Sequence, residues 1–269
     1  MKIGAQAHRS SQISASNAAT ILVRGRDLCG ELIGHVTFTD HTWLLVTGQL
    51  PSAAQRVVLD ATLVAIAEHG LVPSVQASRM TLAAAPEALQ GAVAAGILGC
   101  GSVILGAAEA AGRLLHTIVT RAETAASLAA AAAEVLWEYR DARTAIPGYG
   151  HPLHKGHDPR AQRLLEIGAQ AGIRRGYAEA ALAVERALPE IVGKPLALNV
   201  SGAIPAVLLD VGYPLLALKG VPILARTAGL IAHLLEEQTR PIGFVLSHAG
   251  AAAIQYDGPA PPGFEPDDQ

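Results

Sequence analysis

The sequence is poor in several residue types, and each shortage excludes a class of protein. Cysteine occurs only at Cys29 and Cys100 among 269 residues, which excludes a fold held together by a disulfide framework. There are 20 basic and 23 acidic residues with no basic run, which excludes a nucleic-acid binder held by bulk phosphate attraction. Aromatic residues make up only 4% of the chain, so a core built on large rings is not expected.

Long uninterrupted apolar runs are also missing. No stretch of 18 or more apolar residues lacks charges and turn-forming residues, so we expect no membrane span. The N-terminal sequence MKIGAQAHRSSQISASN has no apolar core of a secretory signal. Both observations favour a cytoplasmic protein.

Aliphatic side chains at helical spacing are abundant. Apolar residues reach 51% of the sequence, and a core of Ala, Leu, Val and Ile lets helices approach closely. We therefore predict an all-α protein, with a short hairpin at 25–35 and a disordered tail after 258. Helices are expected over 51–68, 86–98, 107–120, 124–139, 159–167, 177–187, 202–211 and 222–237.

The densest polar cluster lies in a glycine- and proline-rich loop at 147–160. Its sequence, PGYGHPLHKGHDPR, places three histidines, a lysine and an arginine at the start of a helix. Cations and free N–H groups there favour an anionic ligand. A metal site is an alternative because His151, His154 and His157 are evenly spaced, but the prolines interrupt the helix that such spacing needs. We expect no metal, and a solvated surface loop remains the other interpretation.

The same loop closely resembles the signature of the citrate synthase superfamily, in which G-(Y/F)-G-H is followed by D-P-R. Further segments are similar in the same order: TWLLVTGQLPS, AEHGLVPSVQASRM, LALNVSGAIPAVLLDVGYP, ILARTAGLIAHLLEE and TRPIG. The resemblance covers roughly residues 25–245 and is closest to the citryl-CoA lyases and the citryl-CoA-cleaving module of ATP-citrate lyase.

The resemblance also implies an architecture. The fold would be a citrate synthase-like homodimer of large and small helical domains that close over a dicarboxylate and a CoA thioester. Residues 25–145 and 200–257 would form the large domain and residues 146–199 the small one. Residues 1–24 would be an N-terminal segment and residues 258–269 a disordered tail.

Individual residues take roles from the same resemblance. His151 matches the family histidine that bonds the substrate carbonyl or hydroxyl, and Ser201 stands at the position of the catalytic Asp. His69 matches a histidine that binds the citrate or oxaloacetate part, although a histidine interacting with a helix C-terminus would look the same. The family arginines that bind substrate carboxylates match Arg160, Arg226 and Arg240, the last donated across the dimer.

Arginine is the residue that a polycarboxylate requires, because its planar fork donates two hydrogen bonds to one carboxylate. Arg226 lies inside an otherwise apolar helix, where an unpaired cation is costly. Either an anion site or a structural ion pair is expected there. Gly148, Tyr149, Gly150 and Lys155 would bind coenzyme A, which the resemblance implies as a substrate thioester with no bound cofactor.

Two departures from the family pattern concern the chemistry. Ile104 stands at the position of a catalytic histidine, a loss shared with ATP-citrate lyase. Ser201 replaces the Asp of N-V-D, and a hydroxyl cannot deliver a proton to carbon as a carboxylic acid can.

Three hypotheses for the function follow. The first is a citryl-CoA lyase-like enzyme that cleaves or forms a carbon–carbon bond between an acyl-CoA enolate and a 2-oxo acid such as oxaloacetate. The second is a catalytically impaired relative that binds citrate or acyl-CoA as a regulatory or paired subunit. The third is a different acyl-CoA reaction on the same scaffold, with Ser201 making room for a bulkier substrate.

Overall fold

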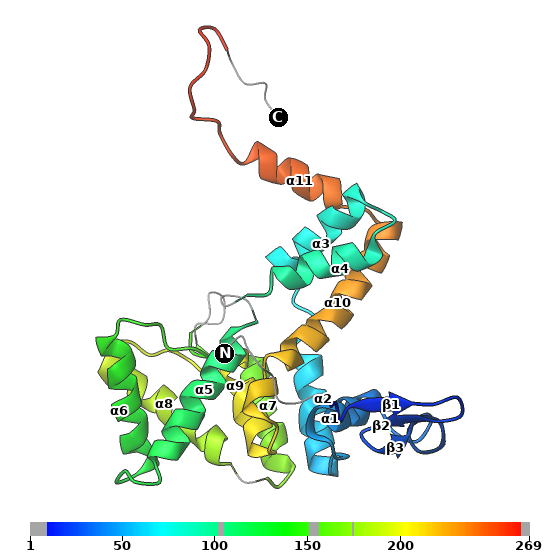
Figure 1. Ribbon diagram of the computed structural model, residues 1–269. Helices are drawn as coiled ribbons and strands as arrows, with labels where there is room; N and C mark the ends of the chain where they lie inside the picture. The colour runs from blue at the N-terminus through cyan, green and yellow to red at the C-terminus, as the bar shows by residue number, and fades with distance from the viewer. Residues whose placement is uncertain (1–9, 102–104, 151–155, 174, 265–269) are drawn as a thin grey trace.

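The chain is mostly helical, as the composition predicts. The computed structural model describes residues 10–101, 105–150, 156–173 and 175–264, and Figure 1 shows its helices gathered in two lobes. The helices are α1 (Phe38–Thr47), α2 (Ala53–Ala67), α3 (Pro73–Ala84), α4 (Leu89–Leu98), α5 (Ala107–Arg121), α6 (Leu128–Asp141), α7 (Pro159–Gln170), α8 (Gly176–Val192), α9 (Val200–Asp210), α10 (Gly220–Thr239) and α11 (Gly243–Ala252), with a 3-10 turn at Leu215–Ala217.

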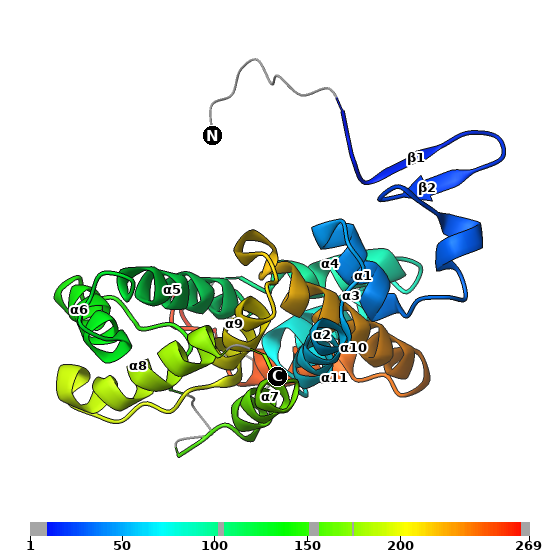
Figure 2. The ribbon, with the colours of Figure 1, turned by 90° about the horizontal axis from the view of Figure 1, so that it is seen from below.

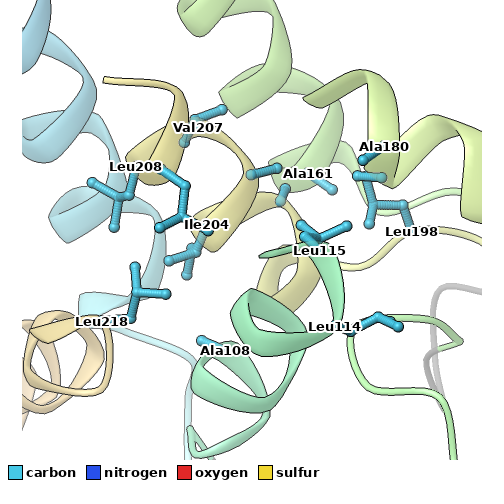
Figure 3. Close-up of a cluster of buried hydrophobic side chains, with 14 of the residues drawn as sticks. Ala108, Leu114, Leu115, Ala161, Ala180, Leu198, Ile204, Val207, Leu208 and Leu218 are labelled. Atoms are coloured by element: carbon cyan, nitrogen blue, oxygen red, sulfur yellow. The ribbon is translucent and has the colours of Figure 1, made fainter. Parts of the chain in front are cut away.

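The first lobe is built around α9, which is buried along nearly its whole length. Val200 and the segment 202–209 are buried, so α9 is apolar on all sides and needs neighbours all round. Helices α5, α7 and α8 pack on it, and α6 packs on α5 and α8. Figure 3 shows the side chains that meet there, including Leu115, Ala161, Ala180, Ile204 and Val207.

The second lobe consists of α3, α4, α11 and the far half of α10 (Figure 1). A small core of Leu82, Ala92 and Leu234 fills it. Helix α2 packs on α10 as well as on α7 and α9, so it connects the two lobes. The predicted division into large and small domains stays a prediction. The segment 146–199 contributes α7 and α8, which lie in the first lobe.

The predicted hairpin at 25–35 is wrong, because the N-terminal strands begin earlier in the chain. Three short antiparallel strands form instead at β1 (Ser14–Ser16), β2 (Ile21–Val23) and β3 (Arg26–Asp27), followed by a π-helical turn at Leu28–Leu32. In Figures 1 and 2 the sheet stands apart from the helices. Arg24 ties it to α1 by donating from Nε (3.0 Å) and Nη2 (2.6 Å) to the Leu45 carbonyl.

Three helices were not among those expected from periodicity: α1, α3 and α11. Helix α1 has a clear start signal, since Thr37 caps it and the Asp40 side chain bonds back to the Thr37 N–H. Helix α3 begins with Pro73 directly after the glycine-containing break, and its N-cap residue, Val72, makes no side-chain bond. Pro73 therefore starts a helix instead of ending a loop.

Helix α10 carries most of the apolar character that a membrane span would need. The segment Leu215–Thr239 is long and apolar enough to cross a membrane, with a mean hydropathy of 1.5 in its most apolar window. A core helix of a globular protein meets the same criteria, and 39% of that window is buried inside the chain. Arg226 lies within it, so the segment is weak support for a membrane protein.

Asp210 joins the end of α9 to the start of α8. Its carboxylate accepts hydrogen bonds from the backbone N–H groups of Tyr177 (2.8 Å) and Ala178 (3.0 Å). Burial raises the pKa of Asp210 to about 6, although these two bonds and Arg175 oppose the rise.

We expect Asp210 to make the stability of the protein pH-dependent. The folded chain holds this proton more tightly than the unfolded chain, so the contribution is present near pH 4 and is lost as the pH rises through 6. After discounting for solvent exposure, the loss is about 1–2 kcal/mol. Urea unfolding at pH 4.5 and 7.5 measures it in the wild type and in Asp210→Asn. Equal pH dependence in the two proteins would contradict this assignment.

Candidate active site

The loop that carries the strongest motif is held against the start of α9 by its backbone. Gly150 N–H donates to the Ala197 carbonyl (2.8 Å), and Asn199 N–H donates to the Gly148 carbonyl (2.9 Å). Gly148 has a φ of +89°, and a Cβ added there would lie 2.7 Å from Gly202 Cα. Two of the predicted coenzyme A residues, Gly148 and Gly150, thus lie beside Ser201. The other members of this motif, His151 and Lys155, lie outside the described residues.

Asn199 organises this junction. Its side-chain Nδ2 donates to the Gly150 carbonyl (2.6 Å), while Oδ1 accepts from the N–H groups of Ser201 (2.9 Å) and Gly202 (3.3 Å). Asn199 is therefore both the N-cap of α9 and the tie to the motif loop. Ser201 occupies the second position of α9, half-buried, where the helix dipole favours negative charge.

Tyr149 points away from this junction. Its hydroxyl donates to the Ala181 carbonyl of α8 (2.9 Å), and the residue is 8% exposed. Burial and the charge of Glu185 raise the pKa of Tyr149 well above its usual value. The side chain anchors the loop to α8, and its predicted contact with coenzyme A stays a prediction.

Asp158 connects the starts of α7 and α9. Its Oδ2 accepts from the Val200 N–H (2.9 Å) and from Arg160 Nη2 (3.0 Å), and its Oδ1 accepts from Arg160 Nε (3.1 Å). Burial acts to raise the pKa of Asp158, but the bonds from Arg160 and Val200 outweigh it and hold the pKa below its usual value. Asp158 is therefore a fixed anion beside Ser201. Among the described residues, no hydrogen bond is made by Arg160 Nη1.

Arg226 is the most unusual charged residue of the structure. It is 2% exposed, and its Nε and Nη1 have no hydrogen-bond partner among the described residues. Ser74 at the start of α3 is 1% exposed, and its Oγ also has no hydrogen-bond partner among the described residues. Both groups lie near the Cys100 thiol, whose Sγ donates to the Gly96 carbonyl (3.4 Å). Burial raises the pKa of this thiol, although the Ser74 hydroxyl and the Arg226 charge act to lower it. A buried cation and hydroxyl without partners in the described structure are the groups that an anionic acceptor would satisfy.

His69 follows α2 and lies near the same stretch of α10. Helix α10 approaches the chain closely there, because a Cβ added to Gly229 would lie 2.2 Å from the Ala67 carbonyl oxygen. The neighbouring Glu68 pairs with His233 of α10 (Oε2 to Nε2, 2.9 Å) and accepts the Gly70 N–H. His69 is exposed and sits between this pair and the start of α3.

The structure brings the predicted residues into two neighbouring groups. The first is at the starts of α7 and α9, with Ser201 and Arg160. The second is at α3 and the middle of α10, with His69 and Arg226. Helix α2 links the two groups because it packs on α7, α9 and α10. Its residues Ala61 and Ala65 line a pocket of about 420 Å³ together with Arg160, and His69 follows the end of the helix.

Arg240 does not join either group within one chain. It directly follows the end of α10, 14 residues after Arg226, which corresponds to about 20 Å along a helix. Its side chain is 81% exposed, and its Nη1 lies 3.9 Å from Glu236 Oε1.

Sequence reasoning missed several residues that shape the site. Asp158 belongs to the D-P-R motif, which assigns it no role of its own, yet it holds both Arg160 and Val200. Asn199 belongs to the N-V-S segment, but its bond to Gly150 joins residues 49 positions apart. Ser74 could have been found from the sequence, because it lies in the segment AEHGLVPSVQASRM that is similar to the family. Its burial near Arg226 makes it a candidate for binding the same ligand.

No group of three His, Cys, Asp or Glu side chains suited to a metal occurs in the ranges that the structure covers. His151 and His154 fall outside those ranges, so the expected absence of a metal stays a prediction.

Comparison with known proteins identifies a family. Residues 54–243 match the model of the citrate synthase C-terminal domain. The structure is similar to citryl-CoA lyase from Hydrogenobacter thermophilus, with 30% identity, a TM-score of 0.83, and coverage of 96% of this chain and 98% of that one. No curated protein sequence matches the chain.

Two more distant structures share the fold. ATP citrate lyase from Methanothrix soehngenii, in complex with citrate and coenzyme A, is 24% identical with a TM-score of 0.76 over 96% of this chain, which spans 43% of the lyase. Citrate synthase from the archaeon Thermoplasma acidophilum is 18% identical with a TM-score of 0.66, over 86% of this chain and 59% of that one.

Proposed function

The chain belongs to the citrate synthase family, and from this premise we propose that it cleaves, or forms, the carbon–carbon bond of citryl-CoA or a close analogue. The observation that carries the proposal is the buried Arg226 guanidinium, whose Nε and Nη1 have no partner among the described residues. The Ser74 hydroxyl, whose neighbour is the Cys100 thiol, also lacks a hydrogen bond of normal geometry among those residues. A substrate carboxylate would satisfy both groups at once.

The reaction requires several charged groups in one place. A base removes the proton of the tertiary hydroxyl, the carbon–carbon bond breaks to give oxaloacetate and an acetyl-CoA enolate, and an acid protonates the enolate carbon. We assign the base to His151, and carboxylate binding to His69, Arg160 and Arg226. The start of α9 lies beside Gly148 and Gly150, where the helix dipole favours developing negative charge, while its first N–H groups are bonded to Asp158 and Asn199.

The acid that protonates the enolate carbon is the component in which this chain departs from the family pattern. Ser201 is at the position where the family carries a carboxyl. Asp158 is bonded to the same helix start, but its lowered pKa keeps it ionised, so it cannot donate a proton. This favours the second candidate function, a relative that binds citrate or acyl-CoA while turning it over slowly or not at all.

We further propose that two copies of the chain form the working unit. Ala228, Ile231 and Leu235 lie on one face of α10 and are exposed, with Ile231 at 52% and Leu235 at 64%. Apolar residues at this spacing form a stripe that a second helix can cover. A second copy would also bring in an Arg240 that one chain holds about 20 Å from Arg226.

Placing a charge in this stripe is expected to separate the copies. Leu235→Asp should give a folded monomer, because a carboxylate cannot be buried unpaired at the interface. Sedimentation velocity measures the mass, and turnover should fall with the loss of dimer. A matched control is Val57→Asp on α2, which is 50% exposed and lies outside both α10's stripe and the pocket that Arg160 lines. A wild type that sediments as a monomer would contradict the proposal.

The proposed activity is tested by incubating the protein with citryl-CoA and following oxaloacetate through a coupled reduction. We expect turnover in the wild type and its loss in His151→Ala. Oxaloacetate release no faster than the background rate with citryl-CoA, citramalyl-CoA and methylcitryl-CoA would reject the lyase function. Binding of citrate without turnover would instead support the second candidate.

A further inference from the structure

The turn between α10 and α11 is fixed by a buried carboxylate. Glu237 is 4% exposed, and its carboxylate accepts the N–H groups of Ile242 (3.0 Å) and Gly243 (2.8 Å). Burial acts to raise the pKa of Glu237, but the Arg79 guanidinium and these N–H groups hold the pKa below its usual value. Arg240 belongs to this turn: in the sequence it lies between Glu237 and the two residues, Ile242 and Gly243, whose N–H groups Glu237 accepts.

Arg79 of α3 holds the turn from the other side. It is 2% exposed, and each nitrogen of its guanidinium has a different partner. Nε donates to Glu237 (2.6 Å), Nη1 donates to Glu236 (2.8 Å), and Nη2 donates to the backbone carbonyl of Arg240 (2.9 Å). Lysine could keep the charge but could not reach all three acceptors, because only a planar fork points in these directions.

Close packing leaves this turn little freedom. A Cβ added to Gly243 would lie 2.5 Å from Ala83 Cβ and 2.8 Å from the Arg79 carbonyl oxygen. The turn that contains Arg240 thus packs closely on α3, through Glu237 before it and Gly243 after it. The Arg240 side chain itself is 81% exposed. The anchored backbone fixes the position and direction in which the Cα–Cβ bond of this exposed arginine leaves the surface.

We propose that Arg79 is a positioning residue, which aims Arg240 at the substrate carboxylate bound in the site of a second copy of the chain. The proposal rests on the function proposed above, which gives Arg240 a ligand. If Arg79 only stabilised the turn, its ion pair with Glu237 would be sufficient. The additional bond from Nη2 to the Arg240 carbonyl connects Arg79 directly to the residue whose direction matters.

The test compares citrate and coenzyme A affinities by calorimetry on the full-length protein, so that it does not depend on turnover. Arg79→Lys keeps a cation for Glu237 but loses the fork, and we expect citrate to bind about 10-fold more weakly. Affinity for coenzyme A should not change. Arg121→Lys, at an exposed ion pair with Glu138 in the first lobe, is the matched control and should leave both affinities unchanged.

A double variant separates positioning from folding. If Arg79 acts through Arg240, citrate should bind to Arg79→Lys/Arg240→Met no more weakly than to Arg240→Met alone. Glu236→Gln provides a milder variant, because Glu236 is partly exposed and contacts both arginines. It should weaken citrate binding in the same direction.

Additive losses in the double variant, or a citrate affinity of Arg79→Lys equal to that of the wild type, would overturn the positioning role. Intact citrate binding without turnover would refute only the lyase activity. A wild type that does not bind citrate would overturn both proposals.

Discussion

Replacing Arg226 by methionine is expected to weaken citrate binding strongly while making the ligand-free protein more stable. The Arg226 guanidinium is 2% exposed, and its Nε and Nη1 have no partner in the described chain, so the free protein bears the cost of burying it. A methionine of similar length removes that cost, and we expect the free energy of unfolding to rise by about 1–3 kcal/mol. Loss of the charged partner of a carboxylate should weaken citrate binding by about 10²–10³-fold.

Arg79 provides a contrasting control, since it is equally buried but fully paired. Arg79→Met should lower the free energy of unfolding by about 3–5 kcal/mol, because it leaves the buried Glu237 carboxylate without its cation. Urea unfolding measures both variants, and calorimetry measures citrate binding to the folded ones. If Arg226→Met loses as much stability as Arg79→Met, Arg226 has a structural partner and the anion site is wrong.

Replacing Ser201 by aspartate is expected to raise the rate of citryl-CoA cleavage by about 10²-fold. A positioned general acid typically contributes about 10²–10⁴ in rate, and Ser201 occupies the family's position for one. The second residue of α9 suits a carboxylate, because the helix dipole favours negative charge there. The anionic Asp158 beside it would raise the pKa of the new carboxyl and help it to carry a proton.

The matching control is Ser201→Asn, which has nearly the size of aspartate but cannot ionise. It should be no faster than the wild type in the coupled oxaloacetate assay. A wild type that cleaves citryl-CoA as fast as Ser201→Asp would show that another group already supplies the proton. Equal acceleration by Asn and Asp would show that the effect comes from shape and not from acid chemistry.

Helix starts could be predicted from the sequence where a local signal exists. Asp158 and Pro159 mark the beginning of α7, and Ser52 marks that of α2, where its side chain accepts the Gln55 N–H. Helix α3 was missed because Val72 offers no cap. The short strands of the N-terminal sheet were misplaced because segments such as Ser14–Ser16 are fully exposed and show no apolar alternation.

The residues of the site could be named from motifs, but their relations could not. Arg226 stood out as a cation in an apolar helix, yet an ion pair and an anion site look alike in sequence. The absence of a partner in the described structure now favours the anion site. The bonds from Arg79 to Glu237 and to the Arg240 carbonyl join residues 158 and 161 positions apart, which no local pattern encodes.

A crystal structure of the protein with citrate and coenzyme A tests the substrate site most directly. We predict a citrate carboxylate within hydrogen-bond distance of Arg226 Nε and Nη1 and of Ser74 Oγ. Citrate bound elsewhere, with the Arg226 guanidinium still unpaired or bonded to a side chain of the protein, would contradict the account.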